Sequence, residues 1–143
     1  MKPSNILIDN DRSIVTDFGL ARAVADRPRT LSVVGTAPFM APEQIDASWG
    51  PISERTDVYG LGAVLFTLLT GRPPSAGTMV ADILTDTVSG RAIVTPSGLN
   101  PEVTEQIDVV CERCLERDPA RRFSTADELR VAILDIVARL SDS

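Results

Sequence analysis

Apolar residues fill the stretch from Val58 to Leu69 and fall on every side of the helix expected there. A helix that is apolar all round is typical of the centre of a domain. The pattern predicts a buried helix from Thr56 to Thr70, which ends at Gly71 with two prolines following shortly after. Gly60 and Gly62 lie inside it, and each costs about 1 kcal/mol relative to alanine, so we expect close backbone packing at these positions.

One-sided apolar patterns predict three more helices in the second half of the chain. The first is expected over 78–88. The second would begin at Asn100-Pro101, an N-cap followed by proline, and close at Asp118-Pro119. The third would begin with the capping box Thr125-x-x-Glu128. The residues expected to face the core are Ile107, Val110, Cys111, Cys114 and Leu115 in the second of these helices and Leu129, Ile133, Ile136 and Leu140 in the third.

Residues 5 to 17 alternate between apolar and polar, which predicts a hairpin with strands at 6–8 and 14–16 around Asp9-Asn10-Asp11. Taken alone, the alternation favours an ordinary hairpin. Asn5 and Asp17, however, would then lie at its open end, where an amide oxygen and a carboxylate could meet. Oxygen ligands of this kind suit a magnesium ion carried by a nucleotide. Lys2, the only lysine of the chain, adds a compact positive charge suited to a phosphoryl oxygen.

Composition limits the classes of function. Hydrophobic residues make up 43% and charged residues 24% of the 143 positions, which is typical of a soluble domain. The net charge of −6 argues against nucleic acid and anionic membranes as partners. The longest apolar run falls short of the roughly 20 residues that span a bilayer. With no signal peptide pattern at the N-terminus, we expect a cytoplasmic protein with no membrane segment.

Cys111 and Cys114 form a C-x-x-C motif. A zinc site would need further ligands, and the chain contains no histidine and no second cysteine pair. We therefore expect both cysteines to be ordinary core residues.

Three motifs occur in a fixed order: Lys2-Pro3-Ser4-Asn5, then Asp17-Phe18-Gly19, then Ala41-Pro42-Glu43. Together they resemble the second half of the signature set of protein kinases, and Lys2 favours the serine/threonine class. The resemblance implies a mainly α fold, the C-terminal lobe of a kinase. A short β-hairpin and the end of the catalytic loop would occupy 1–16, a long activation segment 17–43, and a helical bundle around a buried central helix 44–143.

The resemblance also implies roles for individual residues. Asn5 and Asp17 would hold Mg²⁺, Lys2 would contact the phosphates of ATP, and Gly19 would be a structural glycine of the second motif. Thr36 would link the loop that receives the substrate protein to catalysis. Thr30 and Ser32 would be phosphate acceptors of the activation segment. The alternative for these last two is that they are solvated loop hydroxyls.

Two structural roles follow from the same resemblance. Glu43 and Arg122 would form a buried salt bridge that anchors the activation segment, the alternative being two separately solvated charges. Asp57 would accept backbone hydrogen bonds from the catalytic loop, although a negative charge in the first turn of a helix is also favoured by the helix dipole.

The chain lacks other parts of the kinase signature. Met1 stands immediately before Lys2, where the family has the residue that follows His-Arg-Asp, so the catalytic base is absent from these 143 residues, as is a glycine-rich loop. A general base contributes roughly 10²–10⁴-fold in rate. We therefore expect a fragment of a kinase that is inactive alone and needs the missing N-terminal lobe or a partner protein. The alternative is a truncated, non-catalytic lobe that serves as a protein-interaction module.

Overall fold

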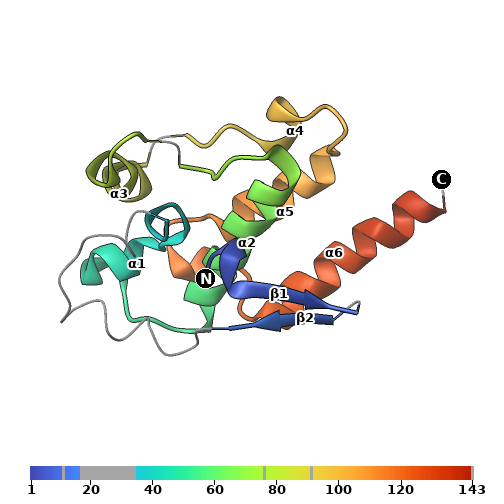
Figure 1. Ribbon diagram of the computed structural model, residues 1–143, viewed down its shortest axis with the longest axis horizontal. Helices are drawn as coiled ribbons and strands as arrows, with labels where there is room; N and C mark the ends of the chain where they lie inside the picture. The colour runs from blue at the N-terminus through green and yellow to red at the C-terminus, as the bar shows by residue number, and fades with distance from the viewer. Residues whose placement is uncertain (11, 17–34, 76, 91, 143) are drawn as a thin grey trace.

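The computed structural model describes residues 1–10, 12–16, 35–75, 77–90 and 92–142. It is mainly helical, with one antiparallel hairpin at the N-terminus (Figure 1). Asp17, Gly19, Thr30 and Ser32, for which the sequence predicts roles, lie outside the described residues. The elements are β1 (Ile6–Asp9), β2 (Arg12–Val15), α1 (Pro42–Ile45), α2 (Glu54–Thr70), α3 (Val80–Ser89), α4 (Pro96–Leu99), α5 (Glu105–Cys114) and α6 (Ala126–Ser141).

Helix α2 runs through the middle of the molecule, as its sequence predicts (Figure 1). It begins with a capping box, in which the Ser53 amide donates to Thr56 Oγ1 at 3.0 Å and the Arg55 amide donates to Ser53 Oγ at 3.3 Å. It ends at Gly71, whose φ of 74° is a conformation that glycine adopts readily. Leu68 is an exception to the predicted burial, because its side chain is 74% exposed.

Two groups of buried side chains pack on α2. The first brings α2 together with the loop before α1 and the end of α5, and it contains Phe39, Ala41, Tyr59, Ala63, Val64, Phe66 and Leu115. The second joins α2 to α5 and α6 and contains Val58, Val110, Cys114, Phe123 and Leu129. Because α2 contributes to both groups, it holds the helical part of the chain together.

Gly62 lets α5 approach α2 closely. A Cβ atom at this position would lie 2.2 Å from the Cβ of Cys114, far inside van der Waals contact. Cys111 and Cys114 are free and buried, as expected for core cysteines. Gly60 is less constrained, since a Cβ atom there would lie 3.1 Å from the side chain of Met1.

Helix α5 begins later and ends earlier than its sequence predicts. Asn100 is extended, and its side chain accepts from the Glu102 amide at 3.1 Å and donates to the Leu69 carbonyl at 2.9 Å. The N-cap of α5 is Thr104 instead. At the other end α5 stops at Cys114, and Asp118 caps a separate short 3₁₀ helix by accepting from the Ala120 amide at 2.9 Å. The prediction that Asp118 closes α5 is therefore wrong.

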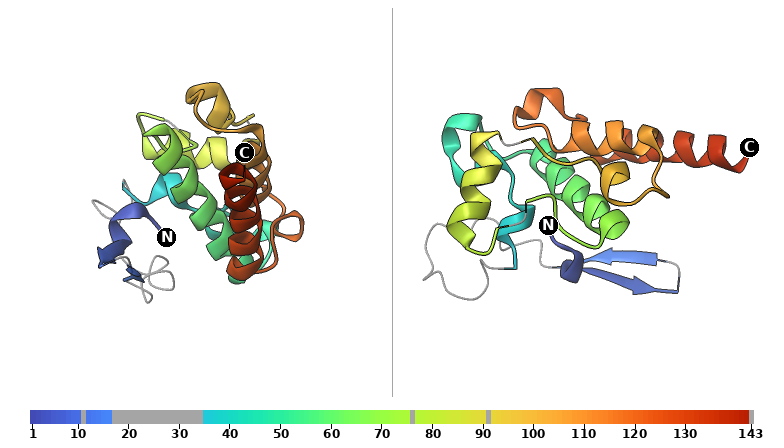
Figure 2. Two further views of the ribbon diagram at one scale, coloured as in Figure 1. Left: turned by 90° about the vertical axis from the view of Figure 1, so that its right-hand side faces the viewer. Right: turned by 90° about the horizontal axis from the view of Figure 1, so that it is seen from above.

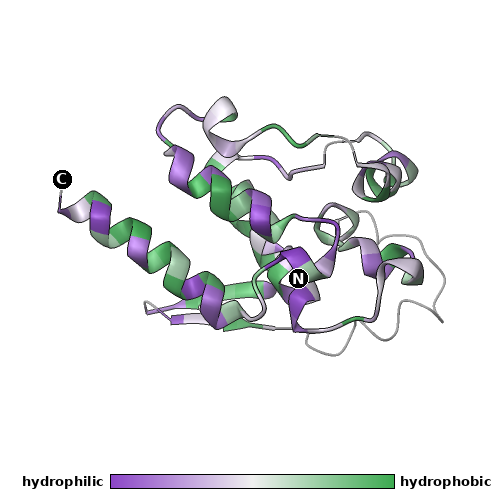
Figure 3. Cartoon of the chain, turned by 180° about the vertical axis from the view of Figure 1, so that it is seen from behind, coloured by the Kyte–Doolittle hydropathy of each residue, from purple (hydrophilic) through white to green (hydrophobic). Residues whose placement is uncertain are grey.

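Helix α6 packs on the core only over its first part. Thr125 caps it by accepting from the Glu128 amide at 3.2 Å, and Leu129 is buried. The last turns extend beyond the other helices (Figure 2). Leu140, expected in the core, is 51% exposed for this reason. Hydrophobic and hydrophilic segments alternate along the whole of α6, including the turns that extend beyond the other helices (Figure 3).

The hairpin forms at the predicted place. β1 and β2 are antiparallel, with Ile6 opposite Val15 and Asp9 opposite Arg12. Asn10 in the turn has φ 45°, a conformation that asparagine tolerates. Leu7 and Ile8 are 53% and 72% exposed, whereas Ile6 packs against the first core group. The hairpin is thus attached to the helical body mainly at its open end.

Candidate functional site: a short N-terminal helix and a buried anchor

Lys2 and Asn5 lie beside the open end of the hairpin. Lys2 is the N-cap of a 3₁₀ helix, Pro3–Asn5, and the Asn5 amide donates to the Lys2 carbonyl at 3.0 Å. The Asn5 carbonyl accepts from the Thr16 amide at 2.7 Å and from Thr16 Oγ1 at 3.2 Å. These bonds extend the strand register by one pair and fix the backbone of Asn5 next to the residue that precedes position 17.

The side chain of Asn5 fits a magnesium ligand as far as the structure describes it. It is half-buried, and its amide makes no hydrogen bond to another described residue. Carboxylate and carbonyl oxygens are the protein ligands that Mg²⁺ accepts. In the described part of the chain, no three acidic or cysteine side chains gather into a metal-binding group.

Thr36 lies at the N-cap of a second short 3₁₀ helix, Ala37–Phe39, and is half-buried. Hydrogen bonds from the Phe39 amide to the Thr36 carbonyl (3.0 Å) and from the Met40 amide to the Ala37 carbonyl (3.2 Å) hold this turn. Phe39 is buried in the first core group and fixes the turn against α2. Residues 36–40, here called the loop segment, lead directly into α1.

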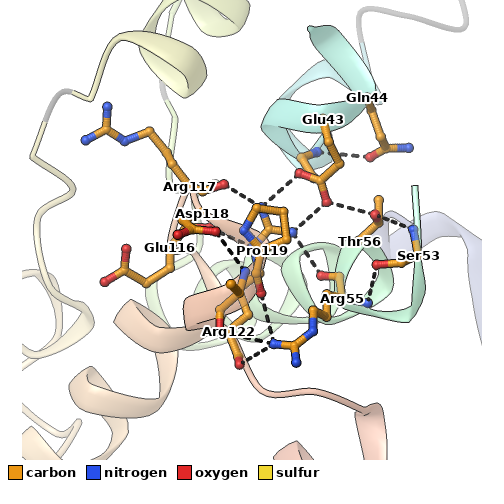
Figure 4. A network of polar contacts seen from close by, with 12 residues as sticks. Glu43, Gln44, Ser53, Arg55, Thr56, Glu116, Arg117, Asp118, Pro119 and Arg122 are labelled. Carbon is orange, nitrogen blue, oxygen red and sulfur yellow. Dashed lines mark hydrogen bonds and ion pairs between the residues drawn. The ribbon is translucent and has the colours of Figure 1, made fainter. Parts of the chain in front are cut away.

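Glu43 and Arg122 form the ion pair expected from the sequence (Figure 4). Arg122 Nη1 lies 2.7 Å from Glu43 Oε1 and Nη2 lies 2.9 Å from Oε2, and both side chains are completely buried. The guanidinium also donates to three carbonyls, those of Glu116 (2.7 Å), Arg117 (3.0 Å) and Arg55 (2.9 Å). The two residues are 79 positions apart, so the pair joins α1 to the segment before α6.

The pKa of the Glu43 carboxyl group reflects this environment. Burial opposes its ionisation and is the largest single influence. Hydrogen bonds from Arg122, from the backbone and from Thr56, with the positive charge of Arg122, together outweigh burial, so the pKa lies below its ordinary value. The group is therefore a carboxylate at neutral pH. Thr56 Oγ1 donates to Glu43 Oε1 at 2.7 Å.

Arg55 is a member of this network that the sequence did not indicate. Its Nη1 donates to the carbonyls of Pro119, Ala120 and Arg122 at 3.1, 3.3 and 3.2 Å, and its Nη2 donates to Ser124 Oγ at 3.0 Å. Arg55 and Arg122 thus each bind the other's backbone carbonyl. The only local signal for this region was the spacing Ser53-x-x-Thr56, which resembles a capping box with threonine in the last position.

Asp57 lies in the first turn of α2 with its side chain exposed. Within the described ranges, its carboxylate accepts no hydrogen bond. Burial lowers the pKa of the Met1 amino group, and the negative charge of Asp57 partly opposes this shift. The hydrogen bonds expected from the catalytic loop stay a prediction, and the position of Asp57 near the helix N-terminus is favourable for a negative charge.

Cys111, Cys114 and Tyr59 are buried ionisable groups that this site does not use. Burial raises the pKa of each cysteine thiol to about 12 and that of the Tyr59 phenol to about 12. All three therefore stay protonated at neutral pH, and the thiols are poor nucleophiles.

Of the helices described here, none is long and apolar enough to cross a membrane.

Comparison with known proteins agrees with the motifs. Residues 1–132 match the family model of the protein kinase domain. The chain is 37% identical over 141 residues to serine/threonine-protein kinase PknB of Mycolicibacterium smegmatis, covering 95% of this chain and 22% of that protein. It is 36% identical over 138 residues to a probable serine/threonine-protein kinase of Streptomyces coelicolor, covering 93% of this chain and 20% of that protein. The chain therefore spans about a fifth of the length of these relatives, and it belongs to the protein kinase domain family.

Proposed function

We propose that these residues form the C-terminal lobe of a serine/threonine protein kinase, which transfers the γ-phosphoryl group of ATP to hydroxyl groups of proteins. The observation that carries the proposal is the position of Asn5. Its backbone is paired with Thr16, the last residue that the structure describes before position 17, at the open end of the hairpin. In this proposal Asn5 and Asp17 supply an amide oxygen and a carboxylate to the magnesium ion that accompanies ATP.

In this proposal Lys2 neutralises charge on the phosphoryl group that is transferred. Residues 17–43 are the activation segment, with Thr30 and Ser32 as its phosphate acceptors, and Thr36 links the loop segment to catalysis. The Glu43–Arg122 pair supports the assignment of Thr36, because it fixes the end of the activation segment to the helical body. Bound magnesium would lower the negative charge of the phosphates, while the protein residues supply position and orientation.

The 143 residues contain neither a His-Arg-Asp motif nor a glycine-rich loop. We therefore propose that this chain by itself does not transfer phosphate and that activity requires these parts from elsewhere. A direct test joins the part of the Mycolicibacterium smegmatis kinase domain that precedes the matched region to this chain. Transfer of labelled phosphate from ATP to a protein substrate is then measured for the chimera and for the chain alone.

The chimera is expected to be active and the chain alone to be indistinguishable from a blank without enzyme. In the chimera, Asp17→Asn and Asn5→Ala should each lower kcat by about 100-fold, since each removes a group that stabilises the transferring phosphate through the metal. Asp9→Asn is the matched control, because Asp9 is an exposed carboxylate of the same hairpin, at its closed end. Equal losses in all three variants would contradict the assigned metal site.

A further inference from the structure

The carboxylate of Glu43 is held by side chains from two sides. Arg122 binds both of its oxygens, and Thr56 Oγ1 donates to Oε1 at 2.7 Å, the same oxygen that Arg122 Nη1 contacts at 2.7 Å. All three residues are buried, with exposed fractions of 4% for Glu43, 5% for Thr56 and 1% for Arg122. Figure 4 shows Thr56 on the α2 side of the carboxylate and Arg122 on the other. The orientation of the carboxylate therefore depends on both neighbours.

The hydroxyl of Thr56 has a defined direction. It accepts a hydrogen bond from the Ser53 amide at 3.0 Å, so its proton is left for Glu43. Threonine also has restricted side-chain rotation, which keeps the hydroxyl in this place. The start of α2 is thus connected to the Glu43 side chain through one hydroxyl group.

The orientation of Glu43 matters for the residues that precede it. Glu43 lies in α1, where the Gln44 amide donates to the Ala41 carbonyl at 2.9 Å and the Ala41 amide donates to Gln44 Oε1 at 2.9 Å. Ala41 follows the loop segment directly, and Ala37 and Phe39 of that segment are buried against the core. A shift of Glu43 would therefore move α1 and the loop segment with it.

We propose that Thr56 is a positioning residue, whose hydroxyl orients the Glu43 carboxylate and thereby holds the loop segment, residues 36–40, in place. The contact itself does not depend on the proposed function. The proposed function enters only in identifying the loop segment as the part that receives the substrate protein. Arg122 provides most of the attraction to Glu43, and Thr56 selects the orientation in which α1 is held.

The test compares three variants of the 143-residue chain. Thr56→Val keeps the shape of the side chain and removes the hydroxyl, Thr56→Ser keeps the hydroxyl, and Ser53→Ala removes the cap contact to the Arg55 amide without touching Glu43. Two properties are measured by NMR: hydrogen exchange of the Phe39, Met40 and Gln44 amides, and the pKa of Glu43 from its carboxyl resonance. Urea unfolding gives the global stability of each variant.

In Thr56→Val, exchange of these amides should be about tenfold faster than the change in global stability explains, since a hydrogen bond to a charged group is lost. The pKa of Glu43 should rise, because one donor to the carboxylate is gone. Ser53→Ala should change global stability alone, and Thr56→Ser should restore both properties. The proposal would be overturned if amide exchange in Thr56→Val rose only as much as the loss of global stability explains. An unchanged pKa of Glu43 in this variant would also overturn it.

A second measurement covers the case in which Thr56→Val does not fold. In the wild-type chain, the Thr56 hydroxyl proton should exchange slowly enough with water to be observed near Glu43, and rapid exchange would overturn the proposal. None of these measurements requires ATP, so their results do not depend on whether the chimera transfers phosphate. In the active chimera described above, Thr56→Val should raise KM for the protein substrate more than it lowers kcat, whereas Ser53→Ala should leave KM unchanged.

Discussion

The N-terminal hairpin and the buried anchor of Glu43 and Arg122 are opposite kinds of structure. In the hairpin, Ile8 and Leu7 are mostly exposed, and the strands depend on pairing with each other. In the anchor, both side chains are completely buried and every charged atom has a partner. Two strands alone are marginally stable in water. The comparison teaches that the proposed metal ligand Asn5 lies in the weakly held region, while the stability of the chain depends on the anchor and on α2.

The largest effect should come from breaking the anchor. Arg122→Ala would leave the Glu43 carboxylate buried without its main partner, and we expect a loss of about 3–5 kcal/mol in the free energy of unfolding at pH 7. Urea denaturation measures this directly. Arg121→Ala is the matched control, because Arg121 faces Glu116 at 4.0 Å with side chains 71% and 41% exposed. Exposed pairs of this kind contribute about 0–1 kcal/mol.

At acid pH, the free energies of unfolding of Arg122→Ala and of the wild type should differ less than at pH 7. The pKa of Glu43 is lowered in the folded wild type, so its ionised form adds stability above the unfolded pKa, and this contribution is lost as the pH falls through the folded pKa. In Arg122→Ala, burial would dominate and raise the pKa, so the carboxyl group would become neutral at a higher pH. A cost of the variant that stays constant between pH 7 and pH 4 would contradict the role of charge in the anchor.

An intermediate effect is expected where α2 and α5 touch. Gly62→Ala would place a Cβ atom 2.2 Å from the Cβ of Cys114, and overpacking of this kind costs about 1–3 kcal/mol. In Gly60→Ala the new Cβ atom would lie 3.1 Å from the Cβ and 3.4 Å from the backbone nitrogen of Met1, a milder contact. The better helix propensity of alanine should offset most of the cost of that contact. Thermal unfolding of the two variants gives the comparison, and an equal loss in both would show that the close approach at Gly62 is unimportant.

The smallest effect belongs to the exposed part of the hairpin. Ile8→Thr should change the free energy of unfolding by less than about 0.5 kcal/mol, because Ile8 is 72% exposed and threonine also suits a strand. Ile6→Thr, two positions earlier, should cost more, since Ile6 packs against the first core group. Both are measured by urea denaturation. A large loss from Ile8→Thr would mean that the hairpin contributes more to folding than its exposure indicates.

The sequence predicts best the features that depend on neighbouring residues. The continuous apolar pattern of α2 and the glycine that follows it give the position of that helix within two residues, and the alternation around Asn10 gives the hairpin. Local signals fail where a distant group takes part. Asn100 reads as a helix cap, but its side chain binds the Leu69 carbonyl 31 positions away, and α5 begins only after Thr104.

The contacts of the candidate site also differ in how far the sequence predicts them. The Glu43–Arg122 pair follows from the resemblance to kinases and not from any local pattern, because the partners are 79 positions apart. The contacts of Arg55 with the carbonyls near Pro119, and of Thr56 with Glu43, could not be read from residue types, since both residues look like ordinary members of a helix start. Leu140 fits the apolar pattern of α6, but that pattern does not show where the helix leaves the core.

The surroundings of Arg122 restrict which amino acid can occupy that position. Its five N–H groups meet five acceptors, two on the Glu43 carboxylate and three on the carbonyls of Glu116, Arg117 and Arg55. Lysine offers three donors on a single nitrogen, so a lysine here would keep the charge but could make at most three of these five contacts. Charge conservation is therefore a poor guide to which substitutions this site tolerates, and a planar, forked donor is the property that any replacement would have to reproduce.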